Sequence, residues 1–172
     1  MSDLVYVRPE GPDDAAAIRA VHCAAFEREG EADLVDALRH NVKLVISLVA
    51  EEEGQIVGHI AFSEVTVQSE VGEFTALGLA PVAVLPERQW RGIGSRLVVV
   101  GLGVCLELGH EIVFVLGHPA YYPRFGFVPA APLGLRWEIE VPEDAFMVRE
   151  NPVGALAGRG GVVKFAEEFG SV

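Results

Sequence analysis

The segment Val84-Leu85-Pro86-Glu87-Arg88-Gln89-Trp90-Arg91-Gly92-Ile93-Gly94-Ser95 decides the fold, because it joins a strand pattern to a long helix pattern. Residues 75–84 predict a strand that Leu85-Pro86 ends, and residues 92–109 predict a helix with apolar side chains on more than one face. A helix start carries unpaired N–H groups and a partial positive charge, and glycines keep side chains from covering them. The turn therefore predicts a binding site for a phosphate or another anion.

The charge of the chain is unevenly distributed. The formal net charge is −12, which argues against binding to a nucleic-acid backbone. Residues 81–130 carry 3 acidic and 4 basic side chains, whereas residues 1–80 carry 15 acidic and 5 basic ones. We expect an anionic ligand to bind in the less acidic segment, where Arg88, Arg91 and Arg96 lie.

The spacing of the glycines excludes the commonest nucleotide sites. The turn lacks the lysine of a P-loop, and the residues after Gly94 lack the third glycine of a dinucleotide-binding fingerprint. His-Glu-x-x-His, Cys-x-x-Cys and calcium-loop spacings are absent from the chain, so no metal site is predicted.

Length and composition predict one domain over residues 1–172. About half of the residues are apolar, and no apolar run is long enough to span a bilayer. The N-terminus lacks the pattern of a signal peptide. Cys23 and Cys105 cannot build a disulfide framework and are expected to be small core residues in a reducing environment, so the predicted location is cytoplasmic.

The remaining patterns predict a mixed sheet with helices packed on it. Strands are expected at 4–9, 42–50, 55–68, 111–116, 136–141 and 162–165, the second and third forming a hairpin. Helices are expected from 12 to 26 and from 31 to 40, with a short helical turn at 119–124.

The pattern Val84-Leu85-Pro86-x-x-Gln89-x-x-Gly92-x-Gly94 resembles the acetyl-CoA-binding signature of the GNAT acetyltransferase superfamily. The resemblance implies an α/β fold of the α+β type, with a mixed, mostly antiparallel sheet and helices on both faces. In this fold the strand ending at Val84 splays away from residues 111–116. The fold core would span about 4–128, and 129–172 would be a variable segment on the acceptor side.

The resemblance also implies which residues hold acetyl-CoA as a co-substrate, without a metal. The pantetheine arm would pair with main-chain groups around Val82, Ala83 and Val84. The pyrophosphate would lie on the turn formed by Gln89, Trp90, Arg91, Gly92, Ile93, Gly94 and Ser95.

A second signature lies in Gly117-His118-Pro119-Ala120-Tyr121-Tyr122-Pro123-Arg124-Phe125-Gly126-Phe127. Many members of the superfamily have Tyr-x-x-x-Gly-Phe here, which implies that Tyr122 protonates the departing CoA thiolate. A phenol, with a pKa near 10, stays protonated at neutral pH and suits this role. Gly117-His118-Pro119-Ala120 replaces the usual Asn-x-x-Ala, a variant similar to a YhbS-like bacterial branch, and leaves the position of the hydroxyl open. Tyr121 is the adjacent competitor.

The attacking amine needs a base, because an alkylammonium has a pKa near 10.4. Glu64, on the strand beside the implied cofactor strand, is the predicted base, with a solvent-facing charge as the alternative. His59 and His118 are weaker candidates, since a lone histidine is more often a packed residue.

The resulting expectation is an N-acetyltransferase that acts on a primary amine of a small molecule or a peptide. The alternatives are a non-catalytic acyl-CoA-binding or sensing module and an acyltransferase that uses an oxygen acceptor or a longer chain. No nucleic-acid or membrane partner is expected, and a homodimer is possible. Trp137, Phe146 and Met147 either line the acceptor pocket or close the core, and the core is favoured.

Overall fold

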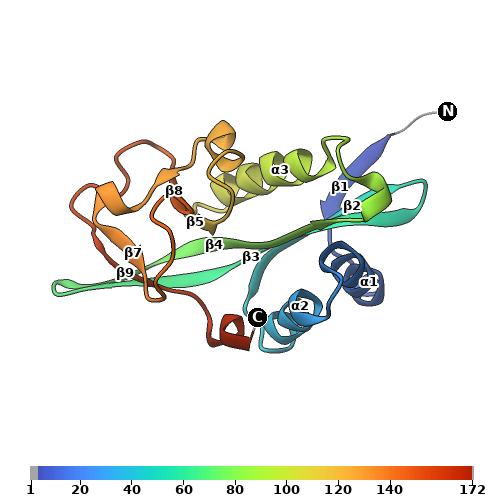
Figure 1. Cartoon of the computed structure of the whole chain (residues 1–172), viewed down its shortest axis with the longest axis horizontal. Coiled ribbons are helices and arrows are strands. Elements are labelled where there is room, and N and C mark those ends of the chain that lie inside the picture. Colours follow the sequence, from blue (N-terminus) through green and yellow to red (C-terminus); the bar gives the residue numbers. More distant parts are fainter. Residues whose placement is uncertain (1–3, 172) are drawn as a thin grey trace.

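The computed structural model describes residues 4–171, and these form a mixed sheet of nine strands (Figure 1). The strands are β1 (Val5–Pro9), β2 (Leu44–Glu52), β3 (Gln55–Ser69), β4 (Gly72–Val84), β5 (Ile112–Leu116), β6 (Val128–Pro129), β7 (Leu135–Trp137), β8 (Phe146–Glu150) and β9 (Gly161–Lys164). Their order is β1-β2-β3-β4-β5-β8-β6, and β9 pairs with both β3 and β7. The predicted mixed, mostly antiparallel sheet is confirmed, because only the β4–β5 and β7–β9 pairs are parallel.

Helices cover both faces of this sheet, as predicted. Figure 1 shows α3 (Ile93–Glu107) on one face, and α1 (Ala15–Phe26) and α2 (Gly30–His40) on the other. Short 3-10 turns complete the chain: η1 (Pro86–Arg88), η2 (Tyr122–Phe125), η3 (Ala131–Leu133) and η4 (Glu167–Ser171). None of the helices described between residues 4 and 171 combines the length and the apolar character that a bilayer crossing requires.

The parallel pair β4–β5 separates after two residue pairs. The strands are in register at Leu77–Val113 and Gly78–Phe114, and β4 then continues to Val84 beside β3 alone. A register shift in the β3–β4 pair lies at this point, and Pro81 has no N–H to donate to a neighbour. Consequently the β5-facing edge of β4 has no strand partner beyond Gly78 among the described residues. The splayed pair that the resemblance implied is therefore present.

The last third of the chain differs most from the sequence-based expectations. The helical turn expected at 119–124 is η2, and the strand expected at 136–141 shrinks to β7. The sequence pattern missed β6 and β8 altogether. β8 is short, and it forms because its side chains pack in the core while its backbone pairs with β5, a long-range contact that local patterns do not reveal.

Two hydrophobic clusters form the core, one under α1 and α3 and the other under the C-terminal strands. Phe146 and Met147 are buried, so the preference for the core is confirmed for these two, whereas Trp137 is half-buried. Cys105 is buried, Cys23 is half-buried, and both are free thiols.

A chain of hydrogen-bonded polar side chains, which includes two fully buried histidines, connects α1 to the sheet. His22 Nε2 lies 2.8 Å from His59 Nδ1, His59 Nε2 lies 2.8 Å from Ser47 Oγ, and Ser47 donates to Glu10 at 2.8 Å. Because Ser47 donates to Glu10, its oxygen accepts from His59, which in turn accepts from His22. Both rings are fully buried, and burial lowers the pKa of His22 to about 4 and that of His59 well below its ordinary value. Both histidines are therefore neutral at pH 7.

Candidate active site

A pocket of about 900 Å³ opens where β4 and β5 diverge. Its wall consists of residues from β4, the turn into α3, the end of β5 and η2, together with two residues of α2 and one each of α1, β7 and η4. The lining residues are Phe26, Glu31, Leu34, Leu79, Ala80, Pro81, Val82, Ala83, Val84, Arg88, Gln89, Trp90, Gly92, Ile93, Gly94, Ser95, Leu116, Gly117, His118, Tyr121, Tyr122, Arg124, Trp137 and Phe169. Nine of the ten predicted cofactor residues are among them, and Arg91 is the exception.

The start of α3 forms one end of the pocket. Gly92 is the N-cap with φ 80°, a backbone conformation that favours glycine, and its exposed position leaves the first N–H groups of the helix open. Gln89 Nε2 donates to the carbonyl of Val84 at 3.0 Å, which fixes the turn to the end of β4. Ser95 Oγ lies on the first turn of α3 and within the pocket wall. The chemistry of this end suits a phosphate group.

A buried carboxylate holds the two arginines that flank the turn. Glu52 accepts a hydrogen bond from Arg88 Nε, and Arg91 Nη1 lies 3.7 Å from the same carboxylate. The hydrogen bond with Glu52 raises the pKa of Arg88 above its ordinary value. Arg88 lines the pocket, while Arg91 is half-exposed outside the wall. Arg91 therefore lies outside the pocket wall and its contact with a ligand stays a prediction, whereas Arg88 is a lining arginine that the predicted site did not include.

Tyr122 begins η2, six residues after the end of β5, and lines the pocket. Its side chain is buried, and burial, with a smaller effect of Tyr121, raises the pKa of its hydroxyl to about 12. The ring lies against Gly117, where an added Cβ would come within 2.3 Å of Tyr122 Cε2. The replacement of the usual asparagine by Gly117 therefore makes room for this ring.

Tyr121 is oriented differently. Its hydroxyl lies 3.0 Å from Ser95 Oγ, and its ring is perpendicular to that of Tyr122. Tyr121 thus joins η2 to the start of α3, at the end of the pocket that suits a phosphate. The two tyrosines line the same pocket at different places.

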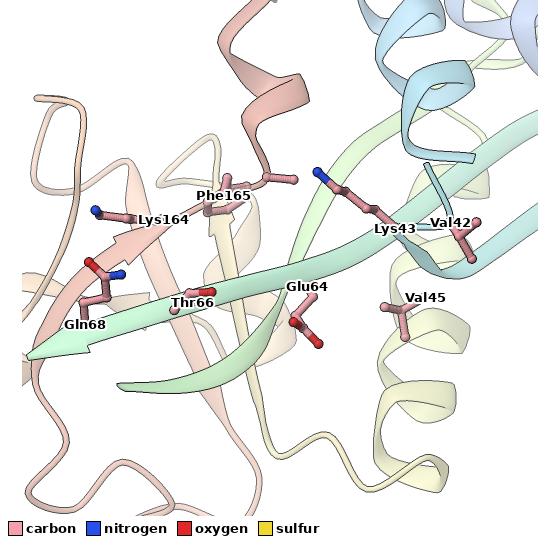
Figure 2. A pocket seen from close by; sticks show the side chains of 9 residues that line it. Val42, Lys43, Val45, Glu64, Thr66, Gln68, Lys164 and Phe165 are labelled. Atoms are coloured by element: carbon pink, nitrogen blue, oxygen red, sulfur yellow. The ribbon is translucent and has the colours of Figure 1, made fainter. Parts of the chain in front are cut away.

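The predicted base Glu64 lies elsewhere. Its side chain is exposed on β3 and lines a separate hollow of about 360 Å³, shared with Lys43, Thr66 and Lys164 (Figure 2). The structure therefore does not bring Glu64 together with Tyr122 in one pocket. Of the two weaker candidates, His118 is exposed and lines the large pocket, whereas His59 is buried in its hydrogen-bonded chain.

The opposite end of the pocket consists of residues outside both signatures, and of these only Trp137 was named from the sequence as a residue that could line an acceptor pocket. Phe26 ends α1, Glu31 and Leu34 lie on α2, and Trp137 and Phe169 come from the C-terminal segment. Glu31 is buried, and its carboxylate accepts hydrogen bonds from Arg28 Nε at 3.1 and 3.0 Å. Burial acts to raise the pKa of Glu31, but the hydrogen bonds from Arg28 act against it and the net shift is downward, so the carboxylate is charged at pH 7.

Comparisons with known proteins agree with this geometry. Residues 6–130 match the family model of the acetyltransferase (GNAT) domain. The chain is 41% identical over 164 residues to the uncharacterized N-acetyltransferase YhbS of Escherichia coli K12, covering 95% of this chain and 97% of that protein. The crystal structure of E. coli YhbS in complex with CoA matches with a TM-score of 0.93 and 38% identity, over 99% of this chain and 94% of that one. A Brucella melitensis GNAT acetyltransferase in complex with acetyl-CoA matches with a TM-score of 0.80 and 37% identity, over 98% and 99% of the two chains. With its sheet, its splayed strand pair and its signature turn, this chain belongs to the GNAT acetyltransferase family.

Proposed function

We propose that this protein transfers the acetyl group of acetyl-CoA to the nitrogen of a primary amine. The observation that carries the proposal is that one pocket is lined both by the open start of α3 and by the largely buried side chain of Tyr122. Two relatives with 38% and 37% identity have structures with CoA and with acetyl-CoA, respectively, which supports the choice of ligand.

The residues present fit acetyl-CoA along its length. The turn from Gln89 to Ser95 offers N–H groups and a hydroxyl for the pyrophosphate, and Arg88 adds positive charge. The β5-facing edge of β4 offers unpaired main-chain groups for the amides of the pantetheine arm. The thioester would then lie in the gap between β4 and β5, beside Tyr122.

The reaction requires a proton donor for sulfur and a route for the amine proton. The neutral amine nitrogen attacks the carbonyl carbon, so that a C–N bond forms and the C–S bond breaks with its electron pair on sulfur. Tyr122 stays protonated at neutral pH and donates its proton to that sulfur. The proton that nitrogen loses on becoming an amide returns through water to the phenol oxygen. Since Glu64 does not line the pocket, the mechanism assigns it no step.

The test is turnover by Tyr122→Phe, measured as CoA release from acetyl-CoA with a panel of primary amines. We expect kcat to fall by about a hundredfold or more, within the range for loss of a general acid, while the Kd for acetyl-CoA stays within about twofold. Tyr121→Phe is the matched control, because it removes the hydroxyl that contacts Ser95 and should affect cofactor affinity more than kcat.

Each alternative function has a distinct result in the same assay. Tight binding of acetyl-CoA by the wild type, with no turnover of any amine, would indicate a sensing module and contradict the proposal. Faster turnover with an alcohol acceptor, or with butyryl-CoA in place of acetyl-CoA, would indicate the oxygen or longer-chain acyltransferase instead.

A further inference from the structure

The large pocket connects the two faces of the sheet. The start of α3 lies on one face, whereas α1 and α2, which contribute Phe26, Glu31 and Leu34, lie on the other (Figure 1). If the α3 end holds the CoA moiety, as the proposed function requires, the end at α1 and α2 is the one left for the acceptor. The chemistry of the acceptor end then indicates the acceptor class, which rests on the proposed acetyl transfer to an amine.

The two ends differ in charge. Arg88 and Arg124 line the α3 end, while Glu31 is the one carboxylate among the described residues that line the pocket. Residues 27–36 carry five carboxylates, of which Glu29, Asp33 and Asp36 pair with Arg19 or Arg39 outside the pocket wall, so Glu31 is the one that presents its charge to the pocket. The acceptor end therefore attracts a cation, whereas the other end attracts an anion.

Glu31 retains the capacity to bind a cationic ligand despite its contact with Arg28. The side chain of Arg28 is 62% exposed, and that of Glu31 is 8% exposed. Arg28 is not among the lining residues, so it approaches Glu31 from outside the pocket wall. The carboxylate accepts three hydrogen bonds from Arg28 and one from the backbone of Glu31 itself, so it attracts a cation in the pocket through its charge rather than through an unused lone pair.

The rest of the acceptor end is apolar and largely aromatic. Phe26 and Leu34 stand beside Glu31 on α1 and α2, and Trp137 and Phe169 come from the C-terminal segment. Trp137 and Phe169 both pack against Phe165, with ring centroids 5.6 and 5.1 Å apart, which holds them in place. Such walls favour an apolar or aromatic body and leave a second cationic group without a partner.

We propose that the acceptor is a monoamine on an apolar or aromatic body, with its ammonium group attracted by Glu31 and its body packed against Phe26, Trp137 and Phe169. A polyamine or a lysine-rich peptide would bring several cations to an end of the pocket that has one carboxylate. Glu31 is then a specificity residue for the reaction, and Arg28 positions it.

The first experiment compares 2-phenylethylamine, ethylamine and spermidine as acceptors, by initial rates of CoA release at saturating acetyl-CoA. We expect kcat/KM for 2-phenylethylamine to exceed that for each of the others by about tenfold or more, because only this probe combines one cation with a buriable ring. Spermidine or ethylamine acetylated as efficiently as 2-phenylethylamine would overturn the inference. If acetyl-CoA binds but no amine of a broad panel is acetylated, the proposed function is wrong, and the assignment of the acceptor class is wrong as well.

The second experiment tests the charge. Glu31→Gln keeps hydrogen-bond acceptance toward Arg28 but removes the charge, and we expect the KM for 2-phenylethylamine to rise about tenfold with little change in kcat or in the Kd for acetyl-CoA. Glu29→Gln is the matched control, because Glu29 is 76% exposed, lies two residues away and does not line the pocket. Equal effects of the two substitutions would show that general surface charge, rather than Glu31, attracts the amine. A thermal melt of Glu31→Gln verifies that the variant is folded.

Phe169→Leu gives an independent measurement of the apolar wall. If the inference holds, this substitution lowers the ratio of kcat/KM for 2-phenylethylamine to kcat/KM for ethylamine, and an unchanged ratio would contradict it.

Discussion

His22 provides a prediction about how the protein responds to mild acid. In the folded protein its pKa is about 4, because the ring is buried and neutral, whereas an unfolded chain has the ordinary value of 6.5. As the pH falls below 6.5, the unfolded state therefore binds a proton that the folded state does not, and the free energy of unfolding decreases. Between pH 7.5 and pH 5.5, His22 alone should remove about 1.3 kcal/mol of stability.

His59 acts in the same direction, since burial also lowers its pKa. The carboxylates with lowered pKa values, including Glu10 and Asp14, behave differently, because their contribution is lost only as the pH falls below their ordinary values near 4. The window from pH 7.5 to pH 5.5 therefore reports on histidines rather than on these ion pairs.

The assay is urea unfolding of the wild type and of His22→Gln at pH 7.5, 6.5 and 5.5. Gln keeps an amide N–H that can donate to His59 but has no proton to bind, so the variant should lose about 1.3 kcal/mol less than the wild type over this range. His40→Gln, at an exposed site on the last turn of α2, is the control for the chemical change itself. If the free energy of unfolding changed with pH by the same amount in the wild type and in His22→Gln, the conclusion that His22 stays neutral in the folded protein would be refuted.

Two further substitutions test the pocket. Gly94→Glu should weaken acetyl-CoA binding by about a hundredfold, because it places an anion where the pyrophosphate is proposed to lie. Gly94→Ala is the control and should bind acetyl-CoA almost normally, since its Cβ would meet Tyr121 Oη at an ordinary contact distance of 3.6 Å. Titration calorimetry measures both Kd values, and similar values for the two variants would be inconsistent with the proposed location of the pyrophosphate. Gly117→Ala should lower kcat more than it raises the Kd for acetyl-CoA, since its Cβ would displace the Tyr122 ring. Gly103→Ala is the control, because no atom lies within 4 Å of the added Cβ. An unchanged kcat in Gly117→Ala would show that the position of the Tyr122 ring is not critical for catalysis.

The strand-turn-helix around Gln89 was predictable because its signals are local. Leu85-Pro86 ends a strand, Gly92 begins a helix, and the apolar faces of residues 93–107 are visible in the chain. The position of Tyr122 after β5 followed from its spacing to Gly126. These features depend on neighbours in the sequence, and the structure contains each of them.

The acceptor end was not predictable by the same means. Glu31 looks like any acidic residue in the first turn of a helix, and it is buried only because α1, α2 and the C-terminal segment meet around it. Conversely, Glu64 interrupts an apolar strand pattern and was predicted as the base, but in the folded chain it is exposed and lines the hollow that it shares with Lys43. Both outcomes depend on tertiary packing, which the spacing of residues along one element does not report.

The separation of β4 from β5 has a kinetic consequence. If acetyl-CoA and the amine bind as proposed, they would enter this gap from opposite faces of the sheet, and either could bind while the other is in place. Both would be bound when the acetyl group moves, and double-reciprocal plots at several fixed amine concentrations would intersect rather than run parallel. A molecule that covalently joined an amine to CoA would pass through the sheet and occupy both entrances at once.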